Sequence, residues 1–161
     1  MPASDGHPRG TPWDAALRYL GQRDHSRLEV QQKLERRGFP AEEITATLER
    51  LNGAGLLDDG AYAQQKAASL FANRGSSVAE VRRKLAQKGV SAADIDRAIT
   101  PANADADFDR ACAEVERRGP TMLGLPAQTR QRRLLSHLAR RGFPEGVCYR
   151  AVLQWEAAQQ N

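Results

Sequence analysis

The sequence predicts an all-α protein, in which three tandem three-helix repeats form a curved, elongated, solenoid-like array. One short basic stretch occurs three times, as "KLERRGFP" (33–40), "KLAQKGVS" (84–91) and "HLARRGFP" (137–144). The glycines within it, Gly38, Gly89 and Gly142, are 51 and 53 residues apart, a period typical of tandem helical units. No segment shows a convincing strand pattern.

Apolar residues recur at fixed distances from each of these glycines. Eight and four residues before the glycine stand Val30 and Leu34, Val81 and Leu85, and Leu134 and Leu138. Six and ten residues after it stand Ile44 and Leu48, Ile95 and Ile99, and Cys148 and Val152. Residues four apart share one face of a helix, so each repeat contains two helices with an apolar stripe on either side of its glycine.

The ends of the helix before each glycine are also marked. Ser26 with Glu29, and Ser77 with Glu80, have the spacing of capping boxes that begin a helix. Each glycine suits the left-handed position that ends one. Phe39, Val90 and Phe143 follow the glycines and are expected to fold back onto the core, and Pro40 and Pro144 stand where the next helix begins.

Another helix precedes each of these pairs, which gives nine helices in all. The openings are "WDAALRYLGQ", "AYAQQKAASLFAN" and "DFDRACAEVERRG". "NGAG" (52–55) and "TPANAD" (100–105) are interpreted as breaks between repeats. The predicted organisation is a flexible tail at 1–12 and three-helix repeats at 13–52, 53–101 and 102–161. Because so small a unit buries little surface, we expect stacking between repeats to supply much of the stability.

Composition limits the classes of protein to which the chain can belong. Of its 161 residues, 40% are hydrophobic, and no apolar run is long enough to span a bilayer. Cys112 and Cys148 lie in helical apolar patterns without metal-ligand spacing, so we expect small buried side chains and no disulfide. The net charge is +4, and the arginines of 129–142 stand without any acid. This segregation favours an acidic or phosphate-bearing partner, although a solvated helix face would show the same pattern.

The combined motifs resemble the RecX family of bacterial regulatory proteins. The resemblance rests on "EVQQKLERRGFPAEEI", "LNGAGLLDDGAYAQQKAASLFANRG" and "SSVAEVRRKLAQKGVSAADIDRAI". It covers residues 13–100 well and weakens in the third repeat, which lacks the capping box. The resemblance implies a cytoplasmic, monomeric, non-enzymatic modulator that binds the RecA recombinase in its filament on single-stranded DNA. It also implies that the modulator inhibits the ATPase, strand-exchange and co-protease activities of RecA in recombination and repair.

No group of residues has the spacing of an active site. Asp58 and Asp59 precede a helix and are interpreted as helix caps. His7, His25 and His137 have no partner at a metal-ligand or catalytic-triad spacing, and there is no phosphate-binding glycine loop. We therefore expect no catalysis, no metal and no cofactor.

The candidate binding residues are basic and lie on the helix that precedes each glycine. The negative end of a helix dipole explains why one cation stands in the last turn of a helix, but not why two or three do. We interpret the cations as a basic ridge that contacts the filament, formed by Lys33, Arg36, Arg37, Arg82, Arg83, Lys84, Lys88, Arg130, Arg132, Arg133, Arg140 and Arg141. Single- or double-stranded DNA is a further candidate partner for these residues.

A helix–turn–helix-like DNA reader that acts without RecA is the alternative. In such a reader the helix after the turn enters the major groove. Here that helix begins with Glu42 and Glu43 in the first repeat, and carries Asp94 and Asp96 in the second. These acids would face the phosphates, so groove readout is disfavoured in these two repeats. Sparse aromatic residues likewise argue against a base-stacking platform.

Overall fold

The structure, a computed structural model, describes residues 10–159, without the side chains of residues 73 and 74. Over this range the chain is helical and contains no strand, which confirms the predicted fold class. The first repeat contains α1 (Pro12–Leu20), α2 (Arg27–Arg36) and α3 (Ala41–Gly53), and the second α4 (Asp59–Arg74), α5 (Val78–Gln87) and α6 (Ala92–Ala98). The third contains α7 (Pro101–Asp105), α8 (Asp107–Arg118), the 3₁₀-helix η1 (Gly119–Met122), α9 (Ala127–Arg140) and α10 (Glu145–Ala158).

The middle helix of the first two repeats begins at the predicted serine. Ser26 caps α2 in a complete capping box with Glu29, and Ser77 accepts a hydrogen bond from the backbone of Glu80 at the start of α5. α9 instead begins after Pro126, which caps no backbone N–H with a side chain.

The three repeated glycines, at φ +81° (Gly38), +76° (Gly89) and +80° (Gly142), have the left-handed backbone expected of a residue that ends a helix.

Each repeat has its own apolar core. Nine buried residues form each of three separate clusters, and the repeated positions occupy equivalent places in all three. Val30, Val81 and Leu134 are at most 1% exposed, as are Leu34, Leu85 and Leu138. Phe39, Val90 and Phe143 are buried behind their glycines as predicted. Because the clusters are separate, no continuous apolar core of the described residues joins the repeats, and the contacts between them are described below.

The third repeat has more helices than the sequence predicted. "TPANAD" separates the second repeat from the third, but it contains a helix that the sequence analysis did not predict, since residues 101–105 form the short helix α7. Thr100 and Asn103 form a capping box, and Pro101 occupies the first turn, where its missing N–H leaves no hydrogen bond unmade. The helix η1 adds a further turn after α8. The described part of the predicted tail, residues 10–12, leads directly into α1, which Thr11 caps; the rest of the tail lies outside the described residues.

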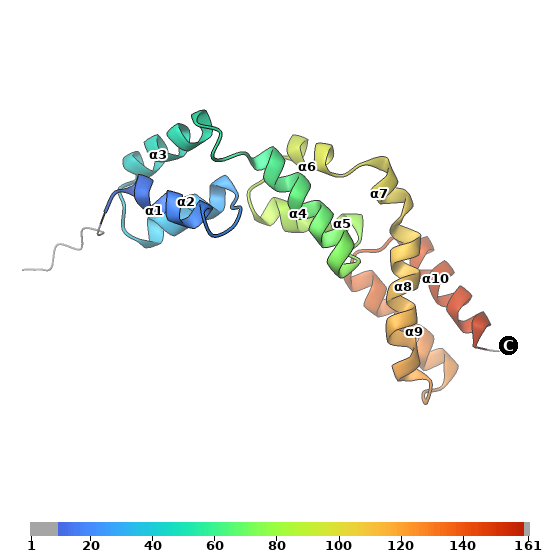
Figure 1. The fold of residues 1–161 in the computed structure, drawn as a ribbon. Coiled ribbons are helices and arrows are strands. Elements are labelled where there is room, and N and C mark those ends of the chain that lie inside the picture. The colour runs from blue at the N-terminus through green and yellow to red at the C-terminus, as the bar shows by residue number, and fades with distance from the viewer. Residues whose placement is uncertain (1–9, 160–161) are drawn as a thin grey trace, which may run out of the picture.

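The repeats follow one another along a bent, elongated array (Figure 1). The helices α3 and α6 lie on the outer side of the bend, and α2 and α5 lie on the opposite side. The helix α9 passes behind α8 in this view. The helices α2 and α5, which carry repeated basic residues, therefore lie on the inner side of the bend.

Basic helices and inter-repeat junctions as a candidate binding surface

The predicted basic residues separate into groups with different surroundings. Five are exposed and have no acidic partner among the described residues: Arg36, Arg83, Arg132, Arg133 and Arg140. Three lie over aromatic rings. Lys33 Nζ is 4.4 Å from the ring centre of Tyr19, the guanidinium of Arg37 is 5.7 Å from that of Phe39, and the guanidinium of Arg130 is 5.8 Å from that of Trp155. These cations therefore pack on aromatic rings of their own repeat.

Three of the basic residues pair with acids of their own repeat. Lys84 Nζ lies 2.6 Å from Glu80, one helical turn away, and Arg82 Nη1 lies 2.5 Å from Asp96 on α6. Arg130 forms two hydrogen bonds to Glu156 on α10, and both side chains are largely buried. Arg130 therefore fastens α9 to α10.

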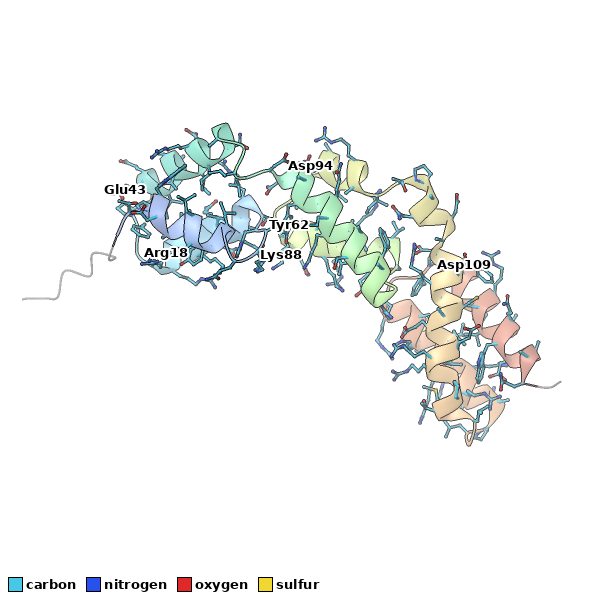
Figure 2. The ribbon with its side chains drawn as sticks, viewed as in Figure 1. Arg18, Glu43, Tyr62, Lys88, Asp94 and Asp109 are labelled. Carbon is cyan, nitrogen blue, oxygen red and sulfur yellow. The ribbon has the colours of Figure 1, made fainter. Side chains whose placement is uncertain are left out.

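Lys88 belongs to the junction between the first and second repeats. Ser26 Oγ donates a hydrogen bond to the carbonyl oxygen of Lys88 at 2.6 Å, and Lys88 Nζ lies 2.8 Å from Glu29. The backbone N–H of Arg27 donates to the Asp59 carboxylate at 2.7 Å. The start of α2 is thus capped by the second repeat as well as by Ser26. Figure 2 shows Lys88 where these two repeats meet.

Glu29 carries most of the charge interactions of this junction. Burial raises the pKa of its carboxyl group, but hydrogen bonds from Lys88, Arg23 and the Ser26 backbone outweigh this effect and hold the pKa at about 2. The carboxylate is therefore ionised at every physiological pH, and its charge stabilises the contact between the two repeats.

Arg141 occupies the equivalent position in the junction between the second and third repeats. Ser77 Oγ donates to the carbonyl oxygen of Arg141 at 2.6 Å, and the backbone N–H of Val78 donates to Asp107 at 3.1 Å. The guanidinium lies 3.4 Å from Glu80. Ser77, Val78, Glu80 and Asp107 thus repeat the roles of Ser26, Arg27, Glu29 and Asp59.

Arg141 also contacts an acid of its own repeat. Its Nη1 lies 2.8 Å from Glu114, which is hydrogen-bonded to His137 at 2.6 Å and to Arg117 at 2.6 Å. Burial raises the pKa of Glu114, while the hydrogen bonds from His137 and Arg117 lower it, and the net direction is down. Glu114 is therefore held ionised beside the junction.

Only some of these junction contacts could be predicted from the sequence. Asp58 caps α4 through the backbone N–H of Ala61, as predicted, but Asp59 caps α2 across the junction. Asp107 was not singled out at all. The available signals were the cation immediately before Gly89 and Gly142, and the glutamate three residues after each serine, although nothing in the sequence states that these residues pair.

The described residues contain no other arrangement that suggests chemistry. No group of three or more metal-ligating side chains lies together among them, and none of their helices has the length and apolar character needed to cross a bilayer. Cys112 and Cys148 are both free thiols, and Cys148 is buried. Among the predicted basic residues, five arginines remain exposed and without an acidic partner in the described part of the chain.

The fold and this surface define a class: a three-repeat helical protein with basic helices and hydrogen-bonded junctions between its repeats. Family models for the first, second and third three-helix domains of RecX match residues 13–51, 58–99 and 105–152. The chain belongs to the RecX family, which confirms the resemblance seen in its motifs.

Curated relatives named "Regulatory protein RecX" support this assignment. The one from Chlorobium phaeobacteroides (strain BS1) is 36% identical and shares 81% of this chain and 84% of its own length. The one from Streptomyces coelicolor is 34% identical over 94% of this chain and 83% of its own length. The relatives are thus named as regulators.

Solved structures show the same fold. The crystal structure of RecX from Lactobacillus salivarius superimposes with a TM-score of 0.77, covering 91% of this chain and 95% of that one at 17% identity. A second RecX crystal structure also gives a TM-score of 0.77, at 24% identity, covering 84% of this chain and 67% of that one. At these identities the likeness establishes the fold alone.

Proposed function

We propose that this protein binds the RecA recombinase in its filament on single-stranded DNA. In this proposal it inhibits the ATPase, strand-exchange and co-protease activities of RecA and catalyses no reaction itself. The filament contacts the basic ridge, and the three repeats extend along it. RecX family membership is the single observation that carries the proposal.

The arrangement of charge supports it. Exposed arginines without acidic partners occur on α2, α5 and α9, so every repeat presents at least one cation that is available to a partner. Cations at the edge of an interface steer a negatively charged partner and set the salt dependence of binding. An elongated array that displays them in each repeat suits an extended polyanionic partner better than a small ligand.

The alternative, a sequence-reading DNA-binding protein, is disfavoured by the helices that would enter the groove. The first turn of α3 carries Glu42 and Glu43, and that of α6 carries Asp94. These carboxylates would face the phosphates on entry into a major groove. The cations are on α2 and α5 instead.

A titration of RecA ATPase activity on single-stranded DNA tests the proposal. The natural protein should lower the ATPase rate. The double variant Arg36→Gln/Arg83→Gln should need a concentration about three- to tenfold higher, because two unpaired cations are removed from the ridge. Lys66→Gln/Arg97→Gln is the matched control, since it removes the same charge outside the ridge and should behave like the natural protein. Circular dichroism should show equal helicity in all three.

An unchanged ATPase rate at micromolar natural protein, together with tight binding to one duplex sequence, would favour the DNA reader. Equal losses in both double variants would show that net charge matters and that the ridge does not.

A further inference from the structure

The third repeat has a hollow surrounded by arginines. It has a volume of 330 Å³ and lies beside η1, between the end of α8 and the outer face of α9. Its lining residues are Arg118, Met122, Arg132, Arg133, Ser136 and Arg140. No acid lines this arginine hollow, and none of its four arginines has an acidic partner among the described residues.

The larger hollow at the second junction is different in this respect. It measures 690 Å³ and is also lined by arginines, but each of them is neutralised. Arg110 pairs with Asp107, Arg117 with Glu114, and Arg141 with Glu80 and Glu114. Unpaired like charges that share one hollow repel one another, and an anion bound among them would relieve that repulsion. The arginine hollow is therefore the stronger candidate for a binding site.

The repeat explains where the arginine hollow comes from. Ten and nine residues before its glycine, the first repeat has Leu28 and Glu29, and the second has Ala79 and Glu80. In both repeats this pair forms the face onto which the next repeat docks. A Cβ atom on Gly89 would lie 2.7 Å from Leu28, and one on Gly142 would lie 3.2 Å from Ala79. The glutamates pair with Lys88 and Arg141 of the docked helix ends.

At the same two positions the third repeat has Arg132 and Arg133. At these positions the third repeat therefore has the opposite charge. It also lacks the serine-capped helix start of the other two, because α9 begins at Ala127 and has Arg130 where they have Ser26 and Ser77. A helix end of the kind that docks in this protein carries a cation just before its glycine, and Arg132 and Arg133 would repel it. The equivalent end of a second copy, at Arg37 and Gly38, has that same cation, so head-to-tail docking of two copies is disfavoured.

We propose that the arginine hollow binds the phosphodiester backbone of a DNA strand. Guanidinium groups form paired hydrogen bonds with phosphate oxygens, and arginine is the residue best suited to this geometry. Arg132 and Arg140 are eight residues apart on one helix, which is about 12 Å along its axis.

A DNA strand supplies a phosphate for about every 3.4 Å of helix rise, so one strand can meet the whole row of arginines. An acidic protein surface would have to match the same row with separately placed carboxylates. The continuous row of phosphates therefore favours DNA as the occupant.

This inference deepens the proposed function, since it assigns the third-repeat end of the basic ridge to DNA. It is tested without RecA, so the two can fail separately. The probe is a fluorescently labelled single-stranded oligothymidine, and the measurement is its anisotropy over a series of salt concentrations. The variant is Arg132→Gln/Arg133→Gln/Arg140→Gln, and the charge-matched control is Arg50→Gln/Lys66→Gln/Arg97→Gln.

The natural protein should bind the strand with an affinity that falls steeply with salt. The triple variant should bind at least about tenfold more weakly at low salt, and the slope of log K against log salt should shrink by about 2 for three lost phosphate contacts. The control should keep both the affinity and the slope. All three changed arginines are exposed and unpaired, so circular dichroism and the thermal midpoint should stay close to those of the natural protein.

Equal affinity and slope for the natural protein and the triple variant would overturn this inference, as would equal losses in the variant and the control. Unchanged DNA binding with weakened binding to RecA would assign the hollow to an acidic protein surface, which also overturns it but leaves the proposed function standing. Loss of DNA binding by the variant, with no effect of the natural protein on RecA, would support DNA binding by the arginine hollow and refute the proposed function.

Discussion

The two junctions between repeats use the same backbone contacts but distribute charge differently. In both, a serine at a helix start donates to a carbonyl oxygen of the next repeat at 2.6 Å, and an aspartate of that repeat caps the next N–H. At the first junction one carboxylate, Glu29, accepts from several donors. At the second, one guanidinium, Arg141, lies between two carboxylates, Glu80 and Glu114.

The difference follows from the cation at each junction. Lys88 is a compact point charge that can neutralise one carboxylate at close range, whereas Arg141 has a planar fork of five N–H donors and can connect two. The ion pairs of the first junction therefore depend on the ionisation of a single acid, Glu29. The second has its negative charge divided between two repeats.

Replacing the glycines at the junctions should show the difference between the two junctions most clearly. In Gly89→Ala the new methyl would meet Leu28 Cβ at 2.7 Å on a backbone at φ +76°, so the strain of the left-handed conformation adds to a clash. We expect a loss of about 2–5 kcal/mol in the free energy of unfolding, from the left-handed cost of about 1–2 kcal/mol and an overpacking cost of about 1–3 kcal/mol. Urea denaturation measures this loss.

Substitutions of two other glycines provide the comparison for Gly89→Ala. Gly142→Ala should cost less, because its nearest neighbours, Ser77 Oγ and Ala79 Cβ, are 3.1 and 3.2 Å away. Gly55→Ala should cost only the conformational strain, since it has φ +68° and no atom within 4 Å of the added methyl. If Gly89→Ala were no more destabilising than Gly55→Ala, close packing at the first junction would be disproved.

Acidification should weaken the first junction through Glu29. Its pKa in the folded protein is about 2, against 4.5 in the unfolded chain, so its contribution is complete above about pH 4.5 and is lost as the pH falls toward 2. Glu29→Gln keeps an oxygen for the capping box but not the charge. At neutral pH it should cost about 1–2 kcal/mol, discounted because Lys88 and Arg23 are about half exposed.

Unfolding free energies measured from pH 6 to pH 2 provide the check. The natural protein and Glu29→Gln should converge as the pH falls, because protonation removes the charge that the variant lacks. Glu80→Gln is the comparison at the second junction, where the pKa of Glu80 is also lowered: burial raises it, but the hydrogen bonds and positive charges of Lys84, Ser76 and Arg141 together outweigh this. A constant difference between the natural protein and Glu29→Gln at all pH values would contradict the assigned role of Glu29.

Removing the serine hydroxyls should have the smallest effect, and an equal one at the two junctions. Ser26→Ala and Ser77→Ala each delete an N-cap and a 2.6 Å hydrogen bond to the next repeat. The expected cost of each is about 1 kcal/mol, the usual cost of a lost cap. Ser91→Ala, which removes the cap of α6 within one repeat, is the control. Clearly unequal losses at Ser26 and Ser77 would show that the junctions share less than their geometry suggests.

Much of the fold could be predicted because it depends on local signals. The apolar residues spaced four apart, the serine caps and the positive-φ glycines are each determined within one or two helical turns, and they repeat three times. The helix α7 was missed because Thr100 and Pro101 also occur in turns, and five residues give no periodicity to detect. The candidate surface was predicted only as a set of basic helices.

The sequence by itself determined the three helical units, their cores and the helices on which the cations lie, because these depend on residues close together in the chain. Tertiary structure decided what each cation does. Lys88 lies 59 residues from Glu29, and Arg141 lies 61 from Glu80, so only the docking of successive repeats could show that they are junction residues. Arg132 and Arg133 have no acidic partner among the described residues, and only the folded arrangement around α9 could show this.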